Sequence, residues 1–232
     1  MIIGLTGLYC AGKNHIALML EQRGIPVLDV DKLGHEVIIS ETENIVRRFG
    51  NKILDCNGKI DRKLLGKLVF GRPKELAGLE AIVHPRVNCL AEEWAACNRE
   101  FPVSVINAAL LHKSSVYSKL DAIIAVKAPF PVRFFRAVKR DKRPIGELLK
   151  RAASQKDFPR YKNKQNLSKL FFSGADIYTI QNSGISGSRK ELEKRIETIL
   201  EGLCNGKEKT TACCGFCGSV SGNRLQRGDF NH

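Results

Sequence analysis

Residues 4–15 read GLTGLYCAGKNH and follow the apolar residues MII. Gly7, four further residues and then Gly12-Lys13 have the spacing of a loop that binds phosphate between a strand and a helix. In such a loop, backbone N–H groups surround an anion and the dipole of the helix adds positive potential. We therefore expect Lys13 to reach the β- and γ-phosphates of a nucleotide. The alternative is a glycine turn that only caps a helix. The predicted nucleotide-binding loop comprises Gly7, Leu8, Tyr9, Cys10, Ala11, Gly12, Lys13, Asn14 and His15.

The residue after the lysine departs from the usual pattern. Phosphate-binding loops carry Ser or Thr there, and the hydroxyl helps to hold magnesium, whereas this chain has Asn14. An amide oxygen is a hard, neutral ligand that divalent cations accept, so we predict that Asn14 binds Mg²⁺. Cys10 lies among the loop amides, which would favour its thiolate. The preferred interpretation of Cys10 is a small residue that only fills space.

A second stretch, VLDVDKLGHEV at residues 27–37, places two carboxylates at the end of a predicted strand. At the carboxyl end of a strand beside a phosphate loop, a carboxylate can accept a proton from an attacking hydroxyl. We predict this catalytic role for Asp31, with Asp29 as the next candidate. Capping of the following helix by Asp31 is the alternative, and one residue can serve both purposes.

The composition favours an anionic partner. The formal net charge is +14, and much of the excess lies between Lys127 and Lys169, in RFFRAVKRDKRP and RYKNKQNLSK. Nucleotides, phosphate esters, nucleic acid and acidic lipid all satisfy that charge. The N-terminal region has no signal-peptide pattern, and no run of about 18 uncharged apolar residues follows, so we expect a cytoplasmic protein without a membrane partner.

Apolar runs and helical patterns alternate along the chain, which predicts an α/β fold with about five mostly parallel strands covered on both faces. Two stretches, residues 32–98 and residues 133–172, do not fit this repeat, and we expect them to form lobes over the carboxyl edge of the sheet. The predicted strands are residues 1–6, 25–30, 103–111, 121–126 and 176–182. The predicted helices are residues 13–22, 62–70, 74–98 with a kink at Pro85, 132–142 and 188–203.

Residues 204–232 are rich in Gly, Ser, Asn and Thr and lack an apolar period, so we predict a disordered tail after a single domain of residues 1–203. Cys214 and Cys217 form one Cys-x-x-Cys, but no second pair follows at zinc-finger spacing, which argues against a zinc site. The four cysteines before this tail are scattered, which favours free thiols.

Several motifs in a fixed order resemble the dephospho-CoA kinase family. They are GLTG with GK, VLDVDKLGHEV, FGNKILDCNGKIDRKLLGKLVF, HPRV, INAALL, RFFRAVKRD and ADIYTIQNSG, and the resemblance covers residues 1 to about 201. No single motif decides the family, but the order is specific. The resemblance implies a nucleoside-monophosphate-kinase-like fold with a P-loop, in which residues 32–98 bind CoA and residues 133–172 form a lid. It also implies transfer of the γ-phosphate of ATP to the 3′-hydroxyl of dephospho-CoA.

The same resemblance implies roles for individual residues. Asp31 would face the acceptor hydroxyl, and Arg136 and Arg140, four residues apart on one helix face, would close on ATP. Taken alone, these two arginines would be an exposed basic helix. The positions that match the CoA lobe are Arg62, His84 and Arg86; read without the family, Arg62 starts a helix and His84 packs or caps.

The sequence also departs from the family pattern. Leu8 and Cys10 replace glycines, Ala11 and Asn14 replace serines, and residues 109–113, ALLHK, lack the family's Pro and Glu. A catalytically weak nucleotide-binding protein is therefore one alternative function. A nucleic-acid-binding protein on a nucleotide-binding fold is another, although no aromatic residues are interleaved with the basic run.

Overall fold

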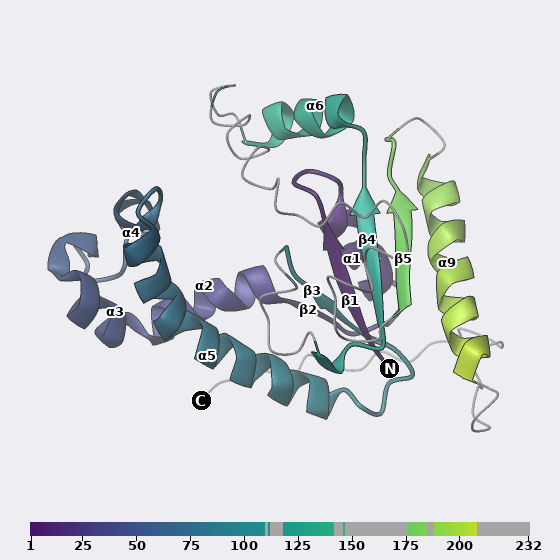
Figure 1. Ribbon diagram of the computed structural model, residues 1–232, viewed down its shortest axis with the longest axis horizontal. Coiled ribbons are helices and arrows are strands. Elements are labelled where there is room, and N and C mark those ends of the chain that lie inside the picture. Colours follow the sequence, from purple (N-terminus) through teal and green to yellow (C-terminus); the bar gives the residue numbers. More distant parts are fainter. Residues whose placement is uncertain (110, 112–117, 142–145, 147–175, 185–187, 208–232) are drawn as a thin grey trace.

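The computed structural model describes residues 1–109, 111, 118–141, 146, 176–184 and 188–207. Its centre is a five-stranded sheet in the order β2-β3-β1-β4-β5, and every pair of neighbouring strands is parallel (Figure 1). This confirms the predicted parallel α/β sheet. The strands are β1 (Ile2–Gly7), β2 (Val27–Asp29), β3 (Ser104–Asn107), β4 (Ala122–Lys127) and β5 (Asp176–Gln181).

The helices agree with the predicted ones to within a few residues, with two additions and one extension. Residues 32–98 contain two further helices, α2 and α3, and the last helix continues past residue 203, so the first residues of the predicted tail are helical. The rest of the tail, and most of the predicted lid, lie outside the described residues. The helices are α1 (Lys13–Glu21), α2 (Val30–Ser40), α3 (Thr42–Phe49), α4 (Arg62–Val69), α5 (Pro73–Cys97), α6 (Phe130–Asp141) and α9 (Ser188–Lys207), with a short 3₁₀ turn η1 (Asn51–Ile53). The helix α5 continues across Pro85.

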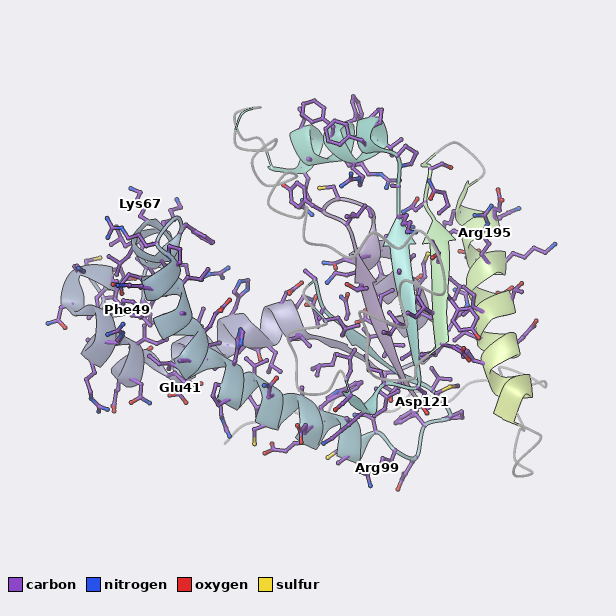
Figure 2. All side chains as sticks on the ribbon, in the orientation of Figure 1. Glu41, Phe49, Lys67, Arg99, Asp121 and Arg195 are labelled. Carbon is purple, nitrogen blue, oxygen red and sulfur yellow. The ribbon has the colours of Figure 1, made fainter. Side chains whose placement is uncertain are left out.

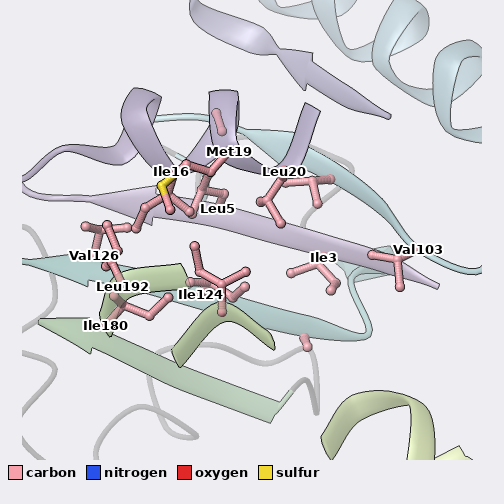
Figure 3. Packing of buried hydrophobic residues seen from close by; sticks show 14 of the residues in the cluster. Ile3, Leu5, Ile16, Met19, Leu20, Val103, Ile124, Val126, Ile180 and Leu192 are labelled. Carbon is pink, nitrogen blue, oxygen red and sulfur yellow. The ribbon is translucent and has the colours of Figure 1, made fainter. Parts of the chain in front are cut away.

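Apolar side chains cover both faces of the sheet because residues alternate along each strand. In β4, Ile124 and Val126 pack with α1 and α9 in one cluster, whereas Ile123 and Ala125 join a second cluster on the opposite face. Figure 3 shows the first cluster, in which side chains of α1 meet those of β1 and β4. The three central strands, β3, β1 and β4, are therefore the buried, near-continuous apolar runs that a doubly covered parallel sheet requires, whereas the edge strands β2 and β5 are only partly buried.

Helices α2 to α5 form a lobe that projects beyond β2, away from α9 (Figure 1). The lobe has its own apolar cluster, which includes Val37, Ile45, Phe49, Leu65 and Val83. Asp61 starts α4 by accepting hydrogen bonds from Lys63 N and Leu64 N. The lobe meets the sheet through α2, which contacts β3, and through α5, whose Ala91 joins the second apolar cluster of the sheet.

Candidate active site

The loop between β1 and α1 borders a cleft of about 1040 Å³ at the carboxyl edge of the sheet. Gly12 caps α1 in the left-handed conformation, at φ 97°, which glycine adopts without strain. The loop, the start of α2, the face of α6 and the segment after β5 all contribute to the cleft. The described residues that line it are Gly7, Leu8, Tyr9, Cys10, Gly12, Lys13, Asn14, His15, Asp31, Ala109, Pro131, Val132, Phe135, Arg136, Lys139, Arg140, Ser183 and Gly184.

Lys13 and Asp31 meet in this cleft. Lys13 Nζ lies 3.0 Å from Asp31 Oδ2, and only 10% of the lysine side chain is exposed, compared with 52% of the aspartate. The pair forms because β1 and β2 flank β3 in a parallel sheet, so that the residues following both strands reach the same edge. An ammonium that binds phosphate and a carboxylate that can take a proton are therefore adjacent.

Asp29, and not Asp31, caps α2. The Asp29 side chain accepts hydrogen bonds from Asp31 N at 3.1 Å and from Lys32 N at 3.2 Å. The capping role considered for Asp31 is therefore filled by its neighbour. Asp31 lies in the first turn of α2, and its carboxylate is available to the cleft.

Asn14 has a neighbour that the sequence motifs did not indicate. Asn107, at the carboxyl end of β3, donates from Nδ2 to Asn14 Oδ1 at 3.4 Å. The other side-chain atom of Asn107, Oδ1, is buried and has no hydrogen-bond partner among the described residues. A buried acceptor without a hydrogen bond lowers the stability of the fold by about 1–3 kcal/mol. The sequence signal for Asn107 was its position at the end of a buried strand beside the loop.

The side-chain amides of Asn14 and Asn107 are candidate ligands for Mg²⁺. No group of three His, Cys, Asp or Glu that could hold a metal ion occurs in the described part of the chain. Mg²⁺ commonly relies on one or two protein oxygens together with substrate phosphates and water. The amide oxygen of Asn14 and the unpaired amide oxygen of Asn107 fit that donor set, with Asn14 the one that lines the cleft.

Helix α6 brings its arginines to the phosphate loop. The Arg140 guanidinium lies over the Tyr9 ring, 5.2 Å from its centroid, which is a cation–π geometry. Arg136 donates to the carbonyls of the loop. Arg133 donates from Nε to Ala128 O at 3.2 Å, and burial lowers the pKa of its guanidinium. Both arginines predicted from the sequence, Arg136 and Arg140, therefore line the cleft.

The three residues predicted for the CoA lobe lie apart from the phosphate loop. Arg62 starts α4 and its Nη2 lies 3.0 Å from His35 Nε2 on α2, a contact that the sequence did not indicate. His84 and Arg86 lie on α5. None of the three is among the described residues that line the cleft. Leu110, His112 and Lys113 lie outside the described residues, and only Ala109 of that altered motif can be placed at the cleft.

The comparisons with known proteins agree with this geometry. The family model for dephospho-CoA kinase matches residues 1–170. The chain belongs to the dephospho-CoA kinase family. The dephospho-CoA kinase of Fusobacterium nucleatum is 32% identical over 203 residues, which cover 86% of this chain and 98% of the relative. The dephospho-CoA kinase of Aquifex aeolicus is 35% identical over 208 residues, which cover 87% and 96%.

Two solved structures have a similar fold. The protein TT1252 from Thermus thermophilus is 30% identical, with a TM-score of 0.69, and the match covers 88% of this chain and 97% of that one. The dephospho-CoA kinase of Campylobacter jejuni has a TM-score of 0.61 at 23% identity, covering 89% and 98%, and so supports the fold. No helix in the described part of the chain is both long and apolar enough to cross a membrane.

Proposed function

We propose that this protein transfers the γ-phosphate of ATP to the 3′-hydroxyl of dephospho-CoA. The observation that carries the proposal is the convergence of Lys13 and Asp31, 3.0 Å apart, in a cleft beside a phosphate-binding loop. Phosphoryl transfer needs a positive charge at the transferred group and a residue that orients the nucleophile. Family membership supplies the identity of the acceptor.

The loop from Gly7 to His15 surrounds the phosphates of ATP in this proposal, with Lys13 at the β- and γ-phosphates. Arg140 and Arg136 approach the nucleotide from α6, although the terminal nitrogens of Arg136 already contact protein acceptors. Asp31 accepts the 3′-hydroxyl proton or orients that hydroxyl. The bound nucleotide lies in the cleft between the loop and α6.

The direct test is an assay with ATP, Mg²⁺ and dephospho-CoA, in which mass spectrometry identifies the product. A product heavier than dephospho-CoA by one phosphoryl group, formed with one equivalent of ADP, supports the proposal. ATP binding without product would instead indicate a catalytically weak nucleotide-binding protein. Tight binding of nucleic acid without either result would indicate the nucleic-acid alternative. We propose that the reaction takes place in the cytoplasm.

The lobe would bind dephospho-CoA through Arg62, His84 and Arg86. Arg62 is exposed at the start of α4, and its guanidinium lies 3.0 Å from His35 Nε2 on α2. The lobe is also rich in exposed cations, including Arg47, Arg48 and Lys67, the last of which is labelled in Figure 2. A basic surface of this kind suits the diphosphate of dephospho-CoA.

Arg62→Ala is expected to raise the KM for dephospho-CoA by about 10- to 100-fold, since a hydrogen bond to a charged group contributes about 1.5–3 kcal/mol. The KM for ATP should change little because Arg62 does not line the cleft. Steady-state kinetics with each substrate varied in turn would measure both constants. Lys63→Ala, an exposed cation on the same turn, is the matched control. An equal rise in both KM values would contradict the assignment.

Asn14→Ser is expected to keep the enzyme active and to shift its dependence on Mg²⁺, because a hydroxyl replaces the amide oxygen as a ligand. Asn14→Ala should have a higher half-saturating Mg²⁺ concentration than either the wild-type protein or Asn14→Ser. The half-saturating Mg²⁺ concentration of the reaction and Mn²⁺ binding with ATP, measured by electron paramagnetic resonance, report the change. If metal dependence and Mn²⁺ binding are the same in all three proteins, Asn14 only starts the helix.

A further inference from the structure

One residue of the phosphate loop other than glycine has a backbone conformation that favours glycine. Cys10 has φ 58°, and it is the only non-glycine residue with a positive φ in the described part of the chain. A side chain in the left-handed region is strained, so other contacts must hold the loop in this conformation.

The carbonyl of Ala11 is the point where the loop is held. It accepts a hydrogen bond from Asn182 Nδ2 at 2.9 Å and a second from Arg136 Nη1 at 3.2 Å. Ala11 is fully buried and Asn182 is 6% exposed. The backbone N–H of Asn182 donates to Lys127 O at 2.7 Å, which ties it to the end of β4. A buried amide at the edge of the sheet thus fixes the middle of the loop.

Arg136 completes the connection from α6. Its Nη2 donates to Asn182 Oδ1 at 3.0 Å, so both polar atoms of the asparagine side chain have partners within the protein. The packing is tight: a Cβ on Gly184 would lie 2.6 Å from Arg136 Nη2, and one on Gly12 would collide with Asn182 Nδ2. Three segments, the loop, α6 and the residues after β5, therefore meet at one set of hydrogen bonds.

We propose that Asn182 is a positioning residue for ATP, and that Asn182 and Arg136 act as a unit that holds the phosphate loop open for the nucleotide. The proposal rests on the proposed function for its nucleotide. Asn182 acts through the Ala11 carbonyl, and Arg136 joins the loop to α6, the helix that lines the cleft. The phosphate-binding geometry of a loop with few glycines then depends on a side chain 171 residues away.

Asn182→Ala tests the proposal through ATP binding, measured by isothermal titration calorimetry. We expect the Kd and the KM for ATP to rise about tenfold, which corresponds to the loss of one hydrogen bond, while the KM for dephospho-CoA stays within about twofold. Alkylation of Cys10 by iodoacetamide, followed by peptide mass spectrometry, should become about fivefold or more faster as the loop loosens. Asn98→Ala, which removes an asparagine bond to Trp94 O at the far end of α5, is the matched control.

Two further variants keep the test decisive. Asn182→Asp retains an oxygen for Arg136 but loses the donor to Ala11, so it should also weaken ATP binding, and it serves if the alanine variant does not fold. If the two residues act as a unit, the double variant Arg136→Lys with Asn182→Ala should have a Kd for ATP no higher than that of the weaker-binding single variant. Additive losses, or unchanged ATP affinity and Cys10 alkylation in a folded Asn182 variant, would overturn the proposal. The ATP titrations do not depend on turnover, so absence of product with dephospho-CoA would count against the proposed function alone.

Discussion

Lys13→Ala is expected to abolish phosphoryl transfer, with kcat at least a hundredfold lower. In the proposed reaction the lysine ammonium is the fixed positive charge that meets the β- and γ-phosphates as negative charge develops on the transferred group, and loss of one such contact costs several kcal/mol. Lys13 itself is largely shielded from solvent, since only 10% of its side chain is exposed, so water cannot replace the missing charge effectively.

The variant should remain folded. Asp31, which loses its ion-pair partner, is half exposed and stays hydrated. Melting temperature by differential scanning fluorimetry and turnover by product mass spectrometry would separate folding from catalysis. Lys32→Ala, an exposed lysine on α2, is the control for the loss of one surface charge. Retention of more than about a tenth of the activity would argue against this loop as the ATP site.

Asp31→Asn is expected to lower kcat by roughly 10²- to 10⁴-fold, the usual range of general-base catalysis. The amide keeps the size of the carboxylate and much of its hydrogen bonding, but it cannot take the proton of the 3′-hydroxyl. ATP affinity should change little, since the phosphate contacts of the loop remain. The ion pair places this carboxylate 3.0 Å from Lys13, the residue that we propose meets the γ-phosphate.

Asp29→Asn is the matched control for this experiment. Asp29 is the cap of α2 and accepts hydrogen bonds from two backbone N–H groups, and Asn caps helices about as well as Asp. The control should therefore keep nearly wild-type kcat. The two substituted positions are two residues apart in the sequence, and both variants replace a carboxylate with an amide. Near-wild-type kcat in Asp31→Asn, with a large loss in Asp29→Asn instead, would move the base to Asp29.

Much of the fold was predictable from local pattern. The buried strand Ile2–Gly7, the glycine spacing and the helix that starts at Lys13 form a continuous segment, so each part constrains its neighbours within about 20 residues. Apolar runs likewise predicted all five strands, most directly β1, β3 and β4, because a strand buried on both faces needs apolar residues throughout. The boundaries differed by a few residues, and the end of α9 at Lys207 was missed because helix ends depend on caps and packing.

The sequence by itself determined the loop and the parallel sheet, and it nominated the residues that we propose bind phosphate, since these follow from spacing and apolar pattern. The tertiary structure decided which polar groups meet. Lys13 pairs with Asp31, Asn107 contacts Asn14, and Asn182 holds the Ala11 carbonyl from the end of β5. These contacts depend on the strand order β2-β3-β1-β4-β5, which brings the ends of strands distant in sequence to one edge. Strand order is set by how long connections pack across the sheet, and local residue pattern does not encode it.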